Sequence, residues 1–186
     1  MKRVVKLLLL LLPLAATGCT ELHVRQGVDQ IQLAIYTPLC IDVLDASTAS
    51  GAHVQAYPCG AGKLSQEWYI TPESGDMFGQ VTIKNANSKM CMTVLSGPNN
   101  SDTAPGEYVV QEPCASDGSE PNQVWMITPA PSGEAGNQII SLASNQCLDL
   151  PYGATASIFD MQQYTCTPGD PAQGWVLNSV SLGNTP

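Results

Sequence analysis

The chain uses tryptophan in a single sequence context, and that context occurs three times. Each tryptophan stands two residues after a glutamine and follows a pair of cysteines. The three copies are Gln66–Trp68, Gln123–Trp125 and Gln173–Trp175. The units that contain them begin near Val28, Gly79 and Gly136, and a period of about 50 residues is typical of repeat architectures.

Each unit has the pattern of short strands joined by turns. A strand-like segment is followed by a cysteine, an alternating stretch such as "CIDVLD", a turn rich in Gly, Ser, Asn and Pro, and a second strand such as "HVQAY". The chain has 16 Gly and 14 Pro, which favours strands and turns over helices. One unit is too short to bury its own apolar face, but three units that close around an axis can do so. The tryptophans are then expected to fill the shared core.

The chain contains seven cysteines, an odd number that needs an explanation in an exported protein. Six of them form three sequential pairs with similar separations, namely Cys40–Cys59, Cys91–Cys114 and Cys147–Cys166. A disulfide in each pair would close a loop of about 20 residues and add about 3 kcal/mol of stability on the chain-entropy model. Zinc binding is the alternative, but there is no short Cys-x-x-Cys pair and only two histidines.

The N-terminal segment is expected to be a targeting signal rather than part of the fold. "MKRVVK" is basic, and the apolar stretch that follows is too short for a transmembrane helix. Its end, "AATGC", resembles the lipobox of bacterial lipoproteins, with Ala16 where leucine is usual. This resemblance implies that residues 1–18 are a signal peptide and that Cys19 is lipidated; ordinary signal cleavage is the alternative. By resemblance to enterobacterial sorting, Thr20 after the cysteine favours the outer membrane.

The charge balance argues against several classes of partner. The net charge is −9, and loss of the three basic residues in the signal would leave −12. Such a surface repels phosphate backbones, so nucleic acid is not an expected partner. Neither a metal nor a cofactor is expected.

The sequence has no nucleophile elbow, zinc-protease motif, P-loop or dinucleotide-binding turn, which argues against an enzyme.

Three repeats with paired cysteines and a terminal Gln-x-Trp resemble the ricin B-type lectin family. The resemblance covers residues 28–180, most of the mature chain, and implies an all-β fold, the β-trefoil. We therefore expect a short anchor or linker at 19–27 and the lectin domain at 28–186. The three Gln-x-Trp motifs would then be structural, with each tryptophan at the same core position of its repeat.

The resemblance also implies sugar-binding residues in the first and third repeats. In this family an Asp after the first cysteine accepts hydrogen bonds from sugar hydroxyls, and a Gln supports it. An aromatic residue before the second cysteine stacks on the sugar ring, and an Asn before Gln-x-Trp adds a contact. The matching residues are Asp42, Gln55, Tyr57 and Ser65 in the first repeat and Asp149, Gln162 and Tyr164 in the third. Ser65 and Ala172 stand in the place of the Asn.

The second repeat departs from this pattern. Thr93, Val110 and Glu112 occupy the positions of the Asp, the Gln and the aromatic residue, and only Asn122 matches. We expect this repeat to be a structural unit without a sugar site. In the other repeats, turn-capping by Asp and ordinary strand packing by Tyr are the simpler interpretations. The recurrence of Asp, Gln and Tyr together at the same offsets favours binding.

Two functions therefore compete. The first is a membrane-anchored lectin that binds galactose-type or related glycans. The second is a protein-interaction subunit, because binding subunits of cytolethal distending toxins are ricin-like trefoils of similar size with degenerate sugar pockets. Such a subunit would display an exposed aromatic cluster and would have toxin partner subunits, and the sequence predicts no such cluster. An envelope protein without glycan binding is a third possibility.

Overall fold

The protein is described by a computed structural model, and the thirteen strands of its described residues make up a single sheet. The described residues are 27–35, 38–73, 79–95, 103–115, 119–131, 134–153 and 158–180. The expected signal peptide and Cys19 lie outside these ranges. No helix in the described residues is long and apolar enough to cross a membrane.

The strands divide into three sets of similar order. The first set is β1 (Val28–Leu33), β2 (Leu39–Val43), β3 (Val54–Pro58) and β4 (Glu67–Pro72). The second is β5 (Gln80–Asn85), β6 (Cys91–Val94), β7 (Val109–Glu112) and β8 (Val124–Pro129). The third is β9 (Asn137–Ser141), β10 (Cys147–Asp149), β11 (Phe159–Asp160), β12 (Gln162–Tyr164) and β13 (Trp175–Val180). Short 3-10 helices are η1 (Leu44–Ala46), η2 (Leu64–Gln66), η3 (Pro121–Gln123) and η4 (Pro171–Gln173).

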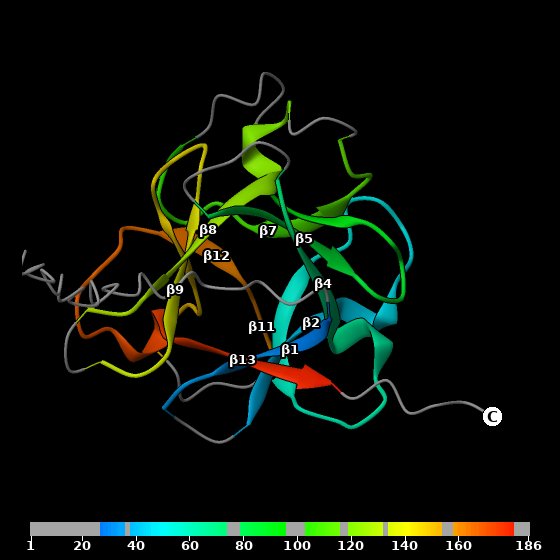
Figure 1. Ribbon diagram of the computed structural model, residues 1–186, viewed down its shortest axis with the longest axis horizontal. Coiled ribbons are helices and arrows are strands. Elements are labelled where there is room, and N and C mark those ends of the chain that lie inside the picture. The colour runs from blue at the N-terminus through cyan, green and yellow to red at the C-terminus, as the bar shows by residue number, and fades with distance from the viewer. Residues whose placement is uncertain are drawn as a thin grey trace, which may run out of the picture.

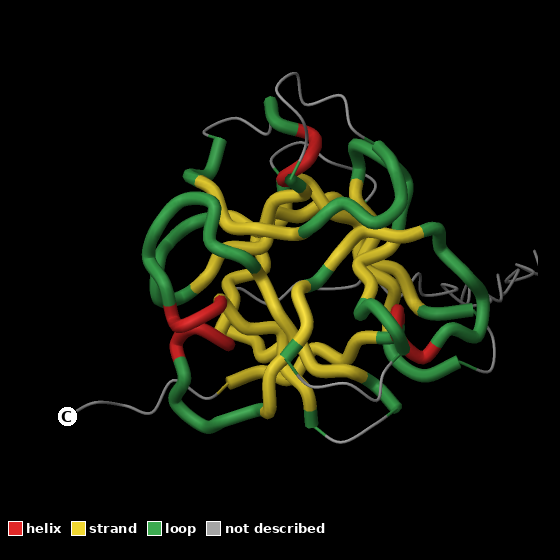
Figure 2. The backbone as a smooth tube through the Cα atoms, turned by 180° about the vertical axis from the view of Figure 1, so that it is seen from behind, coloured by secondary structure: helices red, strands yellow, loops and turns green. Residues whose placement is uncertain are grey.

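The first and last strands of the sets close into a ring. β1 pairs with β4, β4 with β5, β5 with β8, β8 with β9, β9 with β13, and β13 pairs back with β1, all antiparallel. The middle strands form three hairpins, β2–β3, β6–β7 and β10–β12. Figure 1 shows the three sets arranged around a common centre, and Figure 2 shows the short helices grouped at three corners. This closed six-stranded barrel with three hairpins is a β-trefoil, so the predicted fold class is confirmed.

A disulfide in each repeat joins the first strand of the hairpin to the segment that follows the second strand. The bonds join Cys40 to Cys59, Cys91 to Cys114 and Cys147 to Cys166, each with Cα atoms 5.0 Å apart. The pairing inferred from the spacing is therefore confirmed, and the zinc alternative is wrong. Each bond fixes the start of the first hairpin strand against the segment after the second.

The tryptophans fill the centre, and all three are fully buried. Each indole Nε1 donates a 3.0 Å hydrogen bond to the carbonyl of the residue that follows the first cysteine of its repeat. These carbonyls belong to Ile41, Met92 and Leu148. The indole thus satisfies a buried backbone acceptor while its rings supply core volume.

The glutamine of each motif holds the backbone around the second cysteine. Gln66 Oε1 accepts from the N–H of Gly60 at 2.8 Å, and its Nε2 donates to the carbonyl of Pro58 at 3.1 Å. Gln123 and Gln173 make the same pair of bonds in their repeats. One Gln-x-Trp motif therefore fixes the backbone beside both ends of its disulfide.

Three equivalent residues meet where the hairpins converge. Each stands six positions before the second cysteine of its repeat: His53, Tyr108 and Asp160. His53 Nδ1 lies 2.9 Å from Asp160 Oδ2, and the ring of Tyr108 lies 5.2 Å from that of His53. Beneath them, Val54, Val109 and Met161 are fully buried.

Candidate functional site

The first repeat has an open hollow of about 540 Å³ lined by all four of its predicted site residues. Asp42 and Gln55 face each other across the β2–β3 pair, and Tyr57 is paired with Cys40. Because alternate residues of a strand share a face, Asp42 and Tyr57 lie on the same side of the hairpin. Ser65 reaches the hollow from η2. The hairpin and its disulfide thus bring together residues that the sequence separates.

Asp42 accepts a hydrogen bond at only one of its two carboxylate oxygens. Its Oδ2 accepts from Gln66 Nε2 at a long 3.4 Å, while its Oδ1 is buried and has no hydrogen-bond partner among the described residues. A buried carboxylate oxygen without a donor costs free energy. A sugar hydroxyl entering the hollow could supply that donor after a small shift of the side chain.

Several residues of this hollow were missed from the sequence. Lys63 Nζ lies 4.9 Å from the centre of the Tyr57 ring, a cation–π contact. Asp45 follows β2 in the left-handed region with φ 55°. Asn87 comes from the turn of the second repeat and donates to the carbonyl of Ala46 at 2.9 Å. Sequence offsets within one repeat could not find Asn87, because it belongs to the neighbouring unit.

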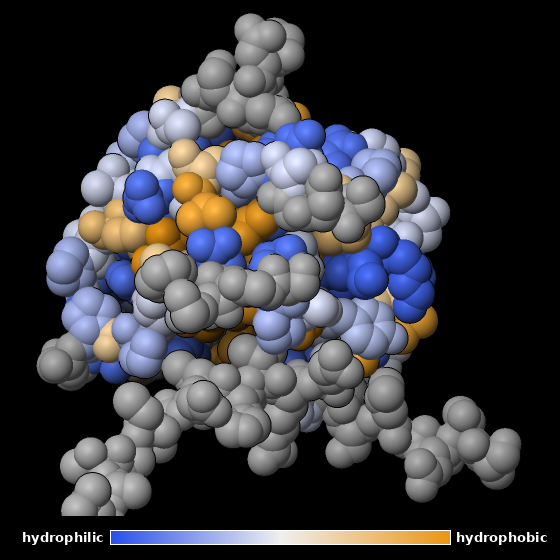
Figure 3. Space-filling view, turned by 45° about the horizontal axis from the view of Figure 1, so that its top comes forward, coloured by the Kyte–Doolittle hydropathy of each residue, from blue (hydrophilic) through white to orange (hydrophobic). Residues whose placement is uncertain are grey.

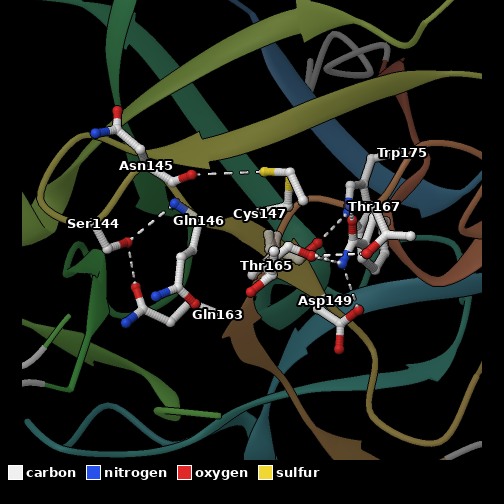
Figure 4. The surroundings of a disulfide bond; sticks show 12 residues. Ser144, Asn145, Gln146, Cys147, Asp149, Gln163, Thr165, Thr167 and Trp175 are labelled. Atoms are coloured by element: carbon white, nitrogen blue, oxygen red, sulfur yellow. Dashed lines mark hydrogen bonds between the residues drawn. A yellow bond between two sulfur atoms is a disulfide. The ribbon is translucent and has the colours of Figure 1, made fainter. Parts of the chain in front are cut away.

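The third repeat places Asp149 in a more complete hydrogen-bond network. Gln162 Nε2 donates to Oδ2 at 2.7 Å, and Gln173 Nε2 donates to Oδ1 at 3.1 Å. Gln173 also contacts the backbone of Thr165 and Thr167, which Figure 4 shows on the same side of the disulfide as Asp149. Burial raises the pKa of Asp149 above 3.8, an effect that the two glutamine hydrogen bonds oppose and the nearby Asp170 carboxylate reinforces.

The supporting glutamine differs between the two repeats. Gln162 contacts Asp149, as the family resemblance predicts. In the first repeat the hydrogen bond to Asp42 comes instead from Gln66, a residue predicted to be purely structural. Gln66 and Gln173 therefore act both in the fold and at the carboxylates.

The third repeat also carries exposed aromatic side chains. Tyr164 is 45% exposed, and Tyr152 is 87% exposed with its ring 5.6 Å from that of Phe159. Ile158 next to them is also exposed. The expectation that the surface has no exposed aromatic group is therefore wrong here. The sequence did not predict this pair because Tyr152 and Phe159 are seven residues apart in the chain.

The second repeat keeps the shape of a hollow, about 320 Å³, with different chemistry. Thr93 Oγ1 donates to the carbonyl of Cys91 at 2.9 Å, and the facing Val110 is buried. Asn122 Nδ2 donates to the carbonyl of Val94 at 3.1 Å. Glu112, in the aromatic position, accepts from Ser50 of the first repeat. These residues serve the contacts between strands and repeats.

The rest of the described surface offers no metal-ligand group. Among the described residues, no cluster of three or more His, Cys, Asp or Glu could hold a metal ion. On the face drawn in Figure 3, blue polar residues surround a smaller orange apolar area.

Comparisons with known proteins agree with this geometry. The family model described as the ricin-type beta-trefoil lectin domain matches residues 29–175. No curated protein sequence matches the chain.

Solved structures share the fold at low sequence identity. A designed three-fold symmetric protein, ThreeFoil, has a TM-score of 0.69 at 24% identity over 83% of this chain and 99% of that one. The C-half of an earthworm R-type lectin in complex with GalNAc gives 0.59 at 16% identity over 83% and 99%. The cytolethal distending toxin of Actinobacillus actinomycetemcomitans gives 0.64 at 16% identity over 86% and 95%. By its family match and its fold, the chain belongs to the ricin-type β-trefoil lectin domain family.

Proposed function

We propose that the protein is a lectin without catalytic activity that binds glycans through its first repeat and, more weakly, through its third. The observation that carries the proposal is the hollow over Asp42, where a buried carboxylate oxygen lacks a donor beside an aromatic ring. Family membership supports carbohydrate binding in general, and the GalNAc complex of the earthworm lectin supports galactose-type sugars as the first to test.

The chemistry of the hollow suits a pyranose. The Asp42 carboxylate would accept hydrogen bonds from adjacent hydroxyls, and the Tyr57 ring would cover the C–H face of the sugar. A single shallow pocket of this kind is expected to bind near millimolar, about −4 kcal/mol. Many copies on one membrane would raise the effective affinity through multivalency.

The proposal includes the location of the protein. The sequence from Met1 to Cys19 supports export, lipidation of Cys19 and attachment to the bacterial outer membrane. Two or three acyl chains would give stable anchoring. The lectin domain would then sit a short linker away from the bilayer.

A glycan array at high ligand density tests the lectin proposal. The wild-type protein should be retained, Asp42→Ala should lose most of the signal, and Asp42→Ala with Asp149→Ala should lose all of it. Thr93→Ala is the matched control, because it changes the equivalent position of the second repeat. Equal retention of the wild type and the double variant would refute the assignment of these sites.

The exposed pair Tyr152–Phe159 favours one second candidate, a protein-binding subunit of a toxin-like complex. The toxin structure from Actinobacillus actinomycetemcomitans shares the fold, and an exposed aromatic surface suits a protein interface. A folded wild-type protein that ignores all glycans offered, but co-purifies from its own organism with a nuclease subunit, would establish this alternative.

A further inference from the structure

A second hollow, about 470 Å³, lies away from the three sugar-type positions, against β1, β4 and β5. Lys84 of β5, Lys89 of the following turn and Tyr69 of β4 line it, together with Gly27 and Val28. Two of the three lysines in the described residues thus face one hollow of an acidic protein. None of the described lining residues is an Asp or Glu.

The pseudo-threefold symmetry shows that the fold does not require cations at this place. Tyr69 faces Lys84 in the pairing of β4 with β5. The corresponding facing pairs in the other two units are Met126–Ile140 and Val176–Gln32. Neither of these pairs carries a charge, yet the strands pair in the same way. The lysines are therefore a feature of this one junction and not of the trefoil.

Lys89 also occupies a backbone conformation that lysine rarely adopts. Its φ is 63°, in the left-handed region, where a residue with a Cβ is disfavoured by about 1 kcal/mol. The equivalent position two residues before the first cysteine of the third repeat is Asn145, with φ 57°. Asn tolerates this region better than lysine. A residue whose backbone conformation costs stability, as that of Lys89 does, points to a functional role.

The Lys89 ammonium is directed into the hollow by two contacts. Its Nζ donates to the carbonyl of Ala86 at 2.7 Å and lies 5.0 Å from the centre of the Tyr69 ring. An ammonium has three donors, so it retains capacity for a ligand. No salt bridge to a described carboxylate involves Lys84 or Lys89.

We propose that the Lys84–Lys89 hollow binds a phosphate group, carried either by a phospholipid head group or by a soluble phosphate ester. Two ammonium groups and the Tyr69 hydroxyl supply donors that match phosphate oxygens. Gly27 and Val28 place the hollow at the start of the domain, eight residues after Cys19. An extended linker of that length reaches at most about 28 Å, so the lipid source rests on the proposed anchor.

The test uses the full mature chain made soluble by Cys19→Ser and labelled for NMR. Inorganic phosphate and glycerol 3-phosphate should move the backbone amides of Lys84 and Lys89 with saturation in the millimolar range. The double variant Lys84→Gln with Lys89→Asn should bind at least tenfold more weakly. Asn at position 89 keeps the left-handed turn, as Asn145 does in the third repeat, and a thermal melt checks that the variant is folded.

A single-charge control and a comparison of two phosphate sources complete the design. Lys63→Gln removes one positive charge, as Lys84→Gln alone does, but from the other hollow, and it should leave phosphate binding intact. Binding to phosphatidylglycerol-containing vesicles that the double variant loses assigns the lipid source, and binding of free phosphate esters alone assigns the soluble one. If sodium chloride at equal ionic strength causes the same shifts, or if the double variant binds as the wild type does, the proposal is overturned.

Discussion

Gln173 Nε2 donates a hydrogen bond to Asp149 Oδ1 at 3.1 Å, which joins a residue of the fold motif to a candidate sugar-binding carboxylate. Gln66 contacts Asp42 in the same way at 3.4 Å. The motif that fixes the disulfide-bearing hairpin therefore also orients the carboxylate. Binding and stability should be coupled in the first and third repeats but separate in the second, where Thr93 replaces the Asp.

The first prediction tests this coupling. Gln173→Ala should destabilise the protein by about 3 kcal/mol, because its amide serves Asp149 and the backbone at Thr165 and Thr167. It should also weaken glycan binding by the third repeat. Gln123→Ala, the matched change in the second repeat, should destabilise by about 2 kcal/mol without affecting binding. Chemical denaturation and array retention measure the two effects; equal loss of binding in both variants would contradict the coupling.

The second prediction concerns the indole hydrogen bond. Trp125→Phe leaves the carbonyl of Met92 without its donor and removes buried volume. We expect a loss of about 2–4 kcal/mol in the free energy of unfolding, with glycan binding retained below the unfolding transition. A loss under 1 kcal/mol, measured by urea denaturation, would show that the indole N–H contributes little.

The third prediction follows from the raised pKa of Asp149. Since the folded pKa lies above the unfolded value, the contribution of this group to stability is fully present below 3.8 and is lost as the pH rises through the folded pKa. Relative to wild type, Asp149→Asn should therefore lose stability as the pH falls from neutral toward 3.8. Replacing one carboxyl oxygen of Asp149 by an amide nitrogen also costs stability through lost hydrogen bonds, but this cost is the same at every pH. Parallel pH dependence in thermal melts of the two proteins would refute this prediction.

The fourth prediction concerns the anchor. Cys19→Ser should move the protein from the membrane fraction to the soluble fraction, because the acyl chains would be absent. Fractionation followed by immunoblotting measures this. Continued association with the membrane through an uncleaved hydrophobic segment would rule out the lipoprotein assignment.

The sequence predicted the repeat unit, the disulfides and the fold because these recur three times at fixed offsets. The strand pattern also placed the start of each unit close to β1, β5 and β9. Some boundaries were not predictable: β1 ends at Leu33, where the alternating pattern continues to Ile35. A recurring sequence pattern predicts that a strand is present more reliably than it predicts where that strand ends.

The sequence did not predict several contacts of the site between residues far apart in the chain. Asn87 reaches the first hollow from the next unit, and the rings of Tyr152 and Phe159 lie 5.6 Å apart. The double role of Gln66 was missed because its spacing to tryptophan indicated only core packing. Of these, only the Asn87 contact joins two repeats, and no offset within one repeat contains it.

The central claim is that the first repeat binds glycan through Asp42, and amide shifts in an NMR titration test it most directly. Galactose, arabinose and N-acetylneuraminic acid are added separately to the soluble mature chain. At least one sugar should shift the amides of Asp42, Ala46 and Ser65 with saturation near millimolar, shift those around Asp149 less, and leave those around Thr93 unchanged. No shift with any of the three sugars, or shifts centred on Thr93 and Asn122, would contradict the account.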